Sequence, residues 1–519
     1  MGKPLRRGYK MSKNIIVTSQ GANLQIYYNL INRINKNGQV GFLTSFYRNF
    51  KEFEETEKKL DSVFFIKEWE IFEKSKLNVK VKSFAKLNKD FPPGILWGSI
   101  LSDRRLIYGK KSKYIEDYNV RFSDNQLYNL IDTFLDEFEI FFKRIKPDVL
   151  IGSVPVTFGE ILAIEYCKKK KIPTLQLHSS RIENYFALHD KILGTSKHFL
   201  QIKKENNFST KEKKKAKKIA EDIRSNGVVY EGVNLKTKTN ININLFIILK
   251  DLLYSIKHEC KKYFDINSRN DNHDPGFLNY WYYKNFVQPY RFLSNQSFLK
   301  KNRRVVDFKR FSEDFEFCFY PLHTEPEVSI QVLGRPYHKN QIELLRNIGA
   351  SLPFGMKLLV KEHPRSIGLR SKSFYKKLLE IPNLFFIDPQ VDSLNIVKKS
   401  SFVAIISSTI GLESLIIGKP ILVLGYPKYA ELFEEGLIRC YNLFELPIKI
   451  SETLKLKKIN EEEIISSLGA LIKGSVPVNF YSKILKKADR YSVKNSLTNN
   501  EEIKNLEKYF LYRINEVVK

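Results

Sequence analysis

The sequence has few cysteines and no long apolar run. Four cysteines, Cys167, Cys260, Cys318 and Cys440, are scattered over 519 residues without the close spacing of a zinc site or a disulfide framework. Such sparse cysteine fits a reducing compartment. No stretch approaches the ~20 apolar residues that cross a bilayer, and the only apolar run near the N-terminus, residues 15–17, is too short for a secretion signal. We therefore expect a cytoplasmic protein.

Acidic residues are scarce relative to basic ones. The chain has 87 Lys and Arg against 57 Asp and Glu, a net charge of +30. Three explanations are open: nucleic-acid binding, contact with an anionic membrane surface or polymer, and the bias of an AT-rich genome. No zinc finger, helix-turn-helix or aromatic-and-basic sheet motif is visible, so we expect no nucleic-acid partner. An anionic membrane surface stays a candidate partner.

The length predicts at least two domains. Residues 1–205 alternate expected strands with expected helices, which predicts a parallel sheet in an N-terminal domain. The strands are expected at residues 14–18, 40–44, 148–151 and 172–177, and a helix at 161–170.

Residues 206–312 interrupt this alternation. They contain a basic run at 211–218, helical periodicity at 245–263 and a dense aromatic segment at 279–292. We interpret them as a helical insertion. The aromatic segment either contacts lipid or packs on its own domain, and the sequence leaves both open.

The strand–helix alternation returns in residues 313–450, and residues 451–519 form a helical, charged C-terminal segment. Strands are expected at 315–320, 356–360, 384–387, 402–406 and 421–424, with helices at 339–348, 371–379, 393–398 and 410–417. The predicted fold class is α/β: two Rossmann-like domains that face a cleft, a helical insertion and C-terminal helices.

Polar segments follow two of these expected strands. Lys361-Glu362-His363-Pro364 follows the strand at 356–360, and Ser407-Ser408-Thr409 follows the strand at 402–406. Ligands of open α/β sheets bind beyond the carboxyl ends of the strands, where helix N-termini attract anions. We therefore expect a phosphate-binding site here. Asp388, at a third strand end, is expected to face the base or ribose of a nucleotide.

Each residue also has a simpler explanation. His363 can cap a strand end, and Ser407 to Thr409 can form an ordinary helix N-cap. Glu413, one turn into the following helix, either binds ribose hydroxyls or favours the helix dipole. Glu325 and Glu327 flank a proline in a loop and belong to the site or to a solvated turn. The coincidence of these segments at the strand ends of one sheet favours binding.

Residues Phe315 to Phe433 resemble the bacterial capsule polysaccharide biosynthesis family. That family has the GT-B architecture and includes transferases of Kdo (3-deoxy-manno-octulosonic acid). The resemblance rests on Lys-Glu-His-Pro, on Ser-Ser-Thr-Ile-Gly-Leu-Glu from residue 407, on Gly-Lys-Pro-Ile-Leu-Val-Leu-Gly from residue 418 and on Pro-Leu-His-Thr-Glu-Pro-Glu from residue 321. The His-Pro and Ser-Ser-Thr pair is also similar to the CMP-binding motifs of bacterial polysialyltransferases. In the N-terminal domain, only residues 147–181 are similar in layout.

The resemblance implies a glycosyltransferase that uses a nucleotide-sugar donor, with a CMP-linked acidic sugar such as Kdo favoured. The acceptor would be a lipid-linked chain or a polysaccharide, and the enzyme would work at the inner face of the cell membrane. No DxD pair lies at a strand end, so we expect no essential metal and no tightly bound cofactor. The expected donor-binding residues are His323, Glu327, His363, Pro364, Asp388, Ser407, Ser408, Thr409 and Glu413.

The acceptor side is expected in the N-terminal domain. An inverting transferase needs a base to take the acceptor hydroxyl proton, and Glu160, beyond the strand that ends at Ile151, is the candidate. Glu160 and His363 are thus the expected catalytic residues. Gln20 and Asn23, in the first strand–helix loop, and Arg181 are expected to bind the acceptor. Arg181 can hold an acidic sugar or a lipid phosphate.

Three alternatives stay open. One is a CDP-glycerol glycerophosphotransferase of the teichoic-acid type, which uses a similar fold and a cytidine donor. Another is a sugar-nucleotide epimerase, although its expected Asp-Ser-Gly-Gly is replaced here by Ser-Ser-Thr-Ile-Gly. The third is a non-catalytic assembly protein that binds polysaccharide or lipid.

Overall fold

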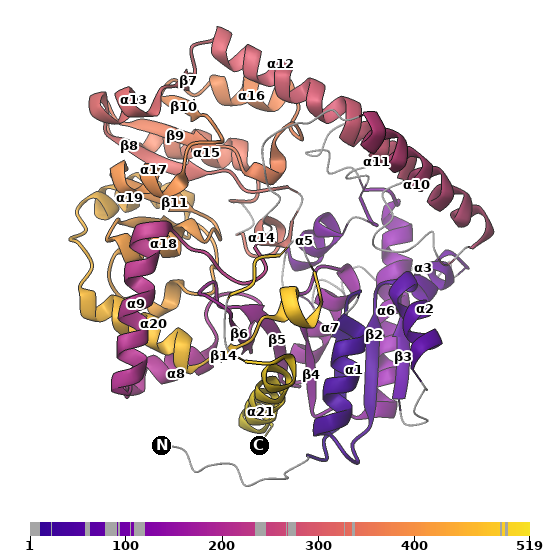
Figure 1. Cartoon of the computed structure of the whole chain (residues 1–519). Coiled ribbons are helices and arrows are strands. Elements are labelled where there is room, and N and C mark those ends of the chain that lie inside the picture. The colour runs from indigo at the N-terminus through magenta and orange to yellow at the C-terminus, as the bar shows by residue number, and fades with distance from the viewer. Residues whose placement is uncertain are drawn as a thin grey trace.

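Two parallel-rich sheets organise the chain. The computed structural model describes residues 11–21, 23–57, 63–77, 91, 94–103, 105–107, 120–233, 245–265, 267, 277–325, 327–334, 338–487, 490–493 and 497–518. Within these ranges the two sheets have seven strands each, and they occupy opposite sides of Figure 1.

The first sheet has the strand order β14-β6-β5-β4-β1-β2-β3. Its strands are β1 (Ile15–Ser19), β2 (Val40–Thr44), β3 (Val63–Lys67), β4 (Val149–Ser153), β5 (Thr174–Ser179), β6 (Tyr185–His189) and β14 (Val476–Pro477). The helices around it are α1 (Asn23–Ile34), α2 (Tyr47–Thr56), α3 (Glu68–Leu77), α5 (Ile95–Ser102), α6 (Asp124–Ile145), α7 (Phe158–Lys169) and α21 (Asn499–Val517).

The second sheet has the order β13-β12-β11-β8-β9-β10-β7, and its paired strands are all parallel. Its strands are β7 (Val305–Val306), β8 (Phe317–Pro321), β9 (Lys357–Lys361), β10 (Leu384–Ile387), β11 (Phe402–Ile405), β12 (Ile421–Val423) and β13 (Leu437–Arg439). Its helices are α13 (Phe308–Asp314), α14 (Val328–Gln331), α15 (Gln341–Ser351), α16 (Lys372–Leu379), α17 (Ser393–Lys399), α18 (Ile410–Ile417) and α19 (Leu446–Leu454).

The central strands are buried on both faces. Every residue of β1, β2, β8 and β11 is buried. Helices on both faces of a parallel sheet require this, and it explains why these strands are almost continuously apolar in sequence. The predicted fold class, with two Rossmann-like α/β domains, is confirmed.

Each sheet contains a point at which the strand order reverses. In the first sheet, β2 lies on one side of β1 and β4 on the other. In the second sheet, β9 lies on one side of β8 and β11 on the other. Ligands of open α/β sheets bind at such switch points, beyond the carboxyl ends of the strands.

Loops at the carboxyl ends of the second sheet rest on the first domain. Lys428, after β12, donates from Nζ to the Ile192 carbonyl oxygen at 2.6 Å, and the Glu431 N–H donates to Thr195 Oγ1 at 3.2 Å. Burial lowers the pKa of Lys428 to about 7. In addition, α14, in the loop after β8, contacts α5. The ends of the second sheet therefore turn toward the first domain.

Three helices lie beside the second sheet, and the chain then returns to the first domain. The helices α8 (Lys197–Glu205), α9 (Thr210–Asn226) and α20 (Glu461–Lys473) pack together, and α9 also contacts α18. After α20, β14 joins the edge of the first sheet beside β6, and α21 packs on α1. The C-terminal segment thus contacts both domains.

A helical arm precedes the second sheet. It consists of α10 (Leu245–Phe264), α11 (Phe277–Tyr282), a π-helical turn (Tyr283–Val287) and α12 (Gln288–Lys301). Figure 1 shows it as a long arm along one edge of the molecule. Across the ranges that the structure describes, no helix combines the length and apolarity needed to cross a membrane.

Candidate functional site

The loops after β8 and β11 are joined at the switch point of the second sheet. The Ser407 N–H donates a hydrogen bond to His323 Nε2 at 3.3 Å, and Ser407 Oγ donates to the Ser329 carbonyl oxygen at 2.7 Å. His323 and Ser407 therefore hold each other at the position where an open α/β sheet binds its ligand.

His323 is neutral at physiological pH. Burial, followed by electrostatic interactions with His363 and Arg370, lowers the pKa of His323 to about 3. Because its Nε2 accepts a hydrogen bond, the ring proton is assigned to Nδ1. His323 is 7 % exposed, and Nδ1 is buried without a hydrogen-bond partner among the residues that the structure describes. A buried donor without a partner indicates a position for a ligand atom or an ordered water.

The N-terminus of α18 is capped only in part. Ser408 Oγ accepts a hydrogen bond from the Ile410 N–H at 3.2 Å, and Tyr429 Oη donates to the Ser408 carbonyl oxygen at 2.6 Å. Thr409 is the N-cap residue but makes no side-chain cap. Within the described ranges, the N–H groups of Ser408 and Thr409 have no acceptor. Such unpaired N–H groups at a helix N-terminus can bind an anion.

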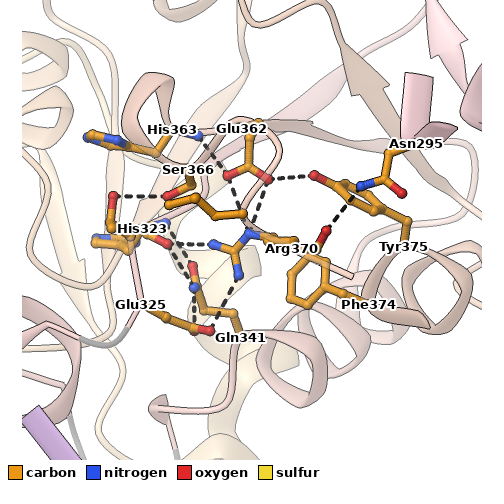
Figure 2. A network of polar contacts seen from close by, with 12 residues as sticks. Asn295, His323, Glu325, Gln341, Glu362, His363, Ser366, Arg370, Phe374 and Tyr375 are labelled. Atoms are coloured by element: carbon orange, nitrogen blue, oxygen red, sulfur yellow. Dashed lines mark hydrogen bonds and ion pairs between the residues drawn. The ribbon is translucent and has the colours of Figure 1, made fainter. Parts of the chain in front are cut away.

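A buried ion network fixes the loops beside this site (Figure 2). Arg370, 1 % exposed, donates from Nε to Glu362 Oε2 at 3.1 Å and from Nη1 to Glu325 Oε2 at 3.3 Å. It also donates from Nη2 to the His323 carbonyl oxygen at 2.6 Å. Tyr375 Oη donates to Glu362 Oε2 at 2.9 Å. Thus one guanidinium neutralises two buried carboxylates and anchors the β8 loop.

The same network places His363 beside His323. Glu362 Oε1 accepts from the His363 N–H at 2.9 Å, and Ser366 Oγ donates to Thr324 Oγ1 at 3.0 Å, which ties the β9 loop to the β8 loop. Gln341 fixes the backbone of His323, because its Oε1 accepts a hydrogen bond from the His323 N–H at 2.8 Å. Figure 2 shows the rings of His323 and His363 on the same side of Arg370. The structure therefore brings together His323, His363 and the Ser407–Thr409 segment.

Asp388 lies farther along the sheet edge. It is exposed and follows β10, two strands from β8, and its Oδ1 accepts from the Gln390 N–H at 2.8 Å. Lys361, at the end of β9, donates to Ser393 Oγ at 2.8 Å, and burial lowers the pKa of its ammonium group. Asp388 acts electrostatically on Lys361.

Glu413 has a protein partner far along the chain. Its Oε1 accepts from the Val228 N–H at 2.7 Å, just after α9. Burial raises the pKa of Glu413 to about 7, with the charge of Asp392 acting in the same direction. Here Glu413 ties α18 to the chain after α9.

Glu327 and Pro364 lie at the margins of the site. Glu327 is the N-cap residue of α14, and its Oε2 accepts from Ser329 Oγ at 3.3 Å. Pro364 is exposed and begins a single 3₁₀ turn, Pro364–Ser366.

Two of the three predicted acceptor-binding residues, Gln20 and Asn23, lie with Glu160 at the switch point of the first sheet. Gln20 Nε2, after β1, donates to Glu160 Oε2 at 2.6 Å and to the Val154 carbonyl oxygen at 2.9 Å. Asn23 Nδ2 donates to Ser153 Oγ at 3.1 Å, and Tyr27 Oη lies 2.9 Å from the same oxygen. These contacts join the loops after β1 and β4.

Glu160 combines a structural position with an unusual pKa. It is the third residue of α7, where its Oε2 accepts from the N–H groups of Val156 and Thr157 at 2.9 and 3.2 Å. Burial, followed by the charge of Glu68, raises the pKa of Glu160 to about 8. A carboxyl group that titrates near neutrality suits general acid–base chemistry.

Arg181 lies apart from this cluster. Its guanidinium carbon is 4.6 Å from the ring centroid of Tyr230, and Nη1 donates to Tyr230 Oη. The Arg181 N–H donates to Ser179 Oγ at 3.2 Å, at the end of β5. Arg181 is therefore held against the segment that follows α9.

Sequence reasoning missed the residues that support the site. Arg370, Gln341, Tyr375 and Tyr27 contact predicted or neighbouring residues but lie at no strand end, and Ser153, which does end β4, was not predicted as a site residue. Glu362 was also not predicted as a site residue. Its place in the Lys-Glu-His-Pro segment is the sequence feature that could have identified it. Among the residues described, no group of three His, Cys, Asp or Glu side chains is arranged to hold a metal ion.

One comparison with known proteins matches this part of the chain. A family model described as "Capsule polysaccharide biosynthesis protein" matches residues 274–438, which include β8, β9, β11 and the loops that follow them. The resemblance inferred from the sequence is confirmed over these residues. No curated protein matches the chain.

Solved structures are similar at low sequence identity. The β-Kdo 2,7-transferase of Thermosulfurimonas dismutans KpsC is 16% identical over 75% of this chain and 97% of its own, with a TM-score of 0.35. The KpsC β-Kdo 2,4-transferase of that organism is 13% identical over 62% and 87%, with a TM-score of 0.31. A UDP-GlcNAc 2-epimerase from Methanocaldococcus jannaschii is 13% identical over 88% and 98%, with a TM-score of 0.25.

Proposed function

We propose that this protein is a glycosyltransferase of capsule or surface polysaccharide synthesis. It transfers a sugar from a nucleotide donor, with a CMP-linked acidic sugar such as Kdo favoured, to a lipid-linked or polysaccharide acceptor. It works in the cytoplasm at the inner face of the membrane. The observation that carries the proposal is the joining of His323, His363 and the Ser407–Thr409 segment at the switch point, within the part that matches the capsule family.

Binding of the sugar donor follows from the hydrogen-bonding groups gathered at this site. A nucleotide leaving group gains negative charge at its phosphate as the glycosidic bond breaks. The N–H groups of Ser408 and Thr409, the Thr409 hydroxyl and the imidazole of His363 would stabilise that charge. Loss of one such donor typically costs ~3–4 kcal/mol of transition-state stabilisation. Because these donors need no metal, we further propose that neither a metal ion nor a tightly bound cofactor is essential.

The acceptor side follows from the first switch point. Gln20 and Asn23 would orient the acceptor near the loops after β1 and β4. Glu160, once deprotonated, would take the proton of the attacking hydroxyl. Arg181, at the end of β5, would attract an acidic group of the acceptor.

Nucleotide binding by the full-length protein tests the proposal. We expect CMP to raise the melting temperature of the wild type, because a ligand bound only by the folded state stabilises it by about 2.7 kcal/mol at a hundred times its Kd. His363→Ala should fold normally and lose turnover and most of this shift. The control, His258→Ala, changes a histidine on α10 and should keep both.

The alternatives give different results in the same experiment. A shift with UDP but not CMP would refute the cytidine donor. Transfer of glycerol phosphate from CDP-glycerol would identify a glycerophosphotransferase. A protein that binds no nucleotide, and in which His363→Ala changes nothing, would be an assembly protein. Full turnover in EDTA is expected, and its loss would overturn the metal-independent reaction.

A further inference from the structure

The helix α10 turns an apolar stripe away from the protein. Leu245, Leu249, Leu253, Ile256 and Phe264 recur along one side of the helix, and they are 72%, 52%, 69%, 42% and 92% exposed. At 3.6 residues per turn these positions form one continuous band. We call these five residues the α10 stripe.

The opposite side of α10 contacts the protein through one buried apolar side chain, Ile248, and through several polar contacts. Ser255 is buried, and its Oγ donates to the Asp251 carbonyl oxygen at 2.7 Å. Asp251 pairs with Lys284 at 2.6 Å. The Ile248 carbonyl oxygen accepts from Trp281 Nε1 at 2.9 Å. A helix that packs only on its own domain buries its apolar side, whereas α10 buries Ile248 and leaves the α10 stripe exposed.

Lysines line one edge of the α10 stripe. Lys250, Lys257 and Lys261 are exposed, and helical periodicity places all three on the side adjoining Leu253. An apolar band edged with lysine is the pattern of helices that lie in the plane of a membrane interface.

A second exposed apolar row follows on the neighbouring helices. Tyr282, Phe286, Tyr290 and Leu293 recur every three or four residues from α11 through α12, and all four are exposed. Tyrosine suits a bilayer interface, because its ring is apolar and its hydroxyl stays hydrated.

We propose that the α10 stripe docks on an anionic lipid bilayer. Its apolar side chains would enter the boundary between headgroups and acyl chains, and Lys250, Lys257 and Lys261 would contact acidic headgroups. The net charge of +30 complements such a surface. A second copy of the chain is a poorer occupant, because lysines of the same sign would face one another. The proposal rests on the membrane location in the proposed function and deepens it by naming the docking surface, but it requires no particular sugar or reaction.

The helical arm is hydrogen-bonded to the loop that carries His363, so docking of the arm would orient the candidate site relative to the bilayer. Gln288 Nε2 of α12 donates to the Ile367 carbonyl oxygen at 2.8 Å, and Asn295 Nδ2 donates to the Arg370 carbonyl oxygen at 3.1 Å. Both acceptors lie in the loop that follows His363. At the other end, His258 Nδ1 of α10 lies 3.3 Å from Arg48 Nη2 of α2. Docking through α10 would therefore hold both domains at a set height above the bilayer.

Vesicle sedimentation with the full-length protein tests the docking. We expect binding to vesicles that contain phosphatidylglycerol and weak binding to pure phosphatidylcholine. Leu249→Ser/Leu253→Ser should lower binding at least about tenfold. Lys250→Glu/Lys257→Glu should lower it about fivefold per lysine, from the usual attraction of one basic residue to an acidic bilayer surface. Each variant should keep the wild-type melting temperature, because the changed side chains are exposed.

Matched controls change the same residue types elsewhere. Phe444→Ser/Ile448→Ser removes two exposed apolar side chains, 94% and 61% exposed, and Lys376→Glu/Lys377→Glu reverses two exposed lysines of α16. Both should bind vesicles as the wild type does. The proposal would be overturned if the α10 variants bound vesicles as well as the wild type does. It would also be overturned if the wild type were a dimer and only the α10 variants were monomers, because the stripe would then be a dimer interface. Turnover on a soluble acceptor should be unchanged in all variants, so failed docking is distinguishable from a failed reaction.

Discussion

His323 Nε2 and the Ser407 N–H form a 3.3 Å hydrogen bond across the switch point of the second sheet. The bond joins two loops separated by 84 residues, and it leaves the Nδ1–H of His323 as the donor available to a ligand. The His323 ring thus stabilises the loop after β11 through Nε2 and offers a hydrogen-bond donor through Nδ1.

Replacement of the His323 side chain should lower both the stability of the protein and its affinity for a nucleotide. His323→Ala leaves the Ser407 N–H without its acceptor, which costs about 1–3 kcal/mol of unfolding free energy. Nucleotide affinity should fall as well, because the Nδ1–H donor is lost. His323→Gln, whose side-chain oxygen can accept from Ser407, should recover part of the stability but not the affinity. Urea denaturation and titration calorimetry measure the two separately, and full recovery of affinity would contradict the ligand role.

Glu160 should impose a pH dependence on turnover. Its pKa is raised to about 8, and a general base acts only when deprotonated. The transfer rate should therefore rise with pH through about 8 and level off above it. Glu160→Gln should abolish the rate at every pH. A glutamine at this position can still accept the cap hydrogen bonds, so the melting temperature should change little. A flat pH profile, or an active Glu160→Gln variant, would exclude Glu160 as the base.

Arg370 should be among the most sensitive positions for stability. Arg370→Met leaves two buried carboxylates, Glu325 and Glu362, without their cation, and removal of one partner from a buried pair costs about 3–5 kcal/mol. Arg346 provides the control, because its pairs with Glu343 and Glu380 are exposed. Arg346→Met should cost about 1 kcal/mol or less. Chemical denaturation compares the two, and equal costs would show that the network is not a structural anchor.

Glu413 should make the protein less stable as pH rises. Its folded-state pKa is about 7, above the ordinary value of 4.5, so the folded state binds a proton more tightly than the unfolded state. The contribution is present below pH 4.5 and is lost as pH rises toward 7. The unfolding free energy of Glu413→Gln, relative to that of the wild type, should therefore rise by about 3 kcal/mol between pH 4.5 and pH 8.

The control for this titration is Glu55→Gln, at an exposed position of α2. Its unfolding free energy should equal that of the wild type at each pH. Guanidinium unfolding at several pH values provides the measurement. Parallel curves for the wild type and Glu413→Gln would show that Glu413 does not titrate in this range.

Much of the architecture was predictable because local patterns carry it. The expected strands at 40–44 and 384–387 and the expected helix at 410–417 match β2, β10 and α18. These elements are continuous apolar runs bounded by polar or glycine residues, and strands buried on both faces require such runs. The antiparallel strands β6 and β14 were not expected, since their pairing joins segments almost 300 residues apart.

The candidate site was predictable only in its outline. Polar segments at strand ends identified His323, His363 and the Ser407–Thr409 segment, because strand ends in a parallel sheet lie at one edge. The partners of Glu413 and Arg181 were not predictable, since Val228 and Tyr230 lie in the chain after α9. The prediction that these two residues bind donor and acceptor stays a proposal.

The sequence alone determined that there are two α/β domains and which polar residues end their strands, because hydrophobic periodicity and strand-end chemistry are local properties. Only the tertiary structure decided which strand ends are neighbours, since strand order depends on packing. It also decided that Arg370 neutralises Glu325 and Glu362, and that α10 turns its apolar side outward. These facts depend on contacts between distant segments, whose energies no short stretch of sequence reveals.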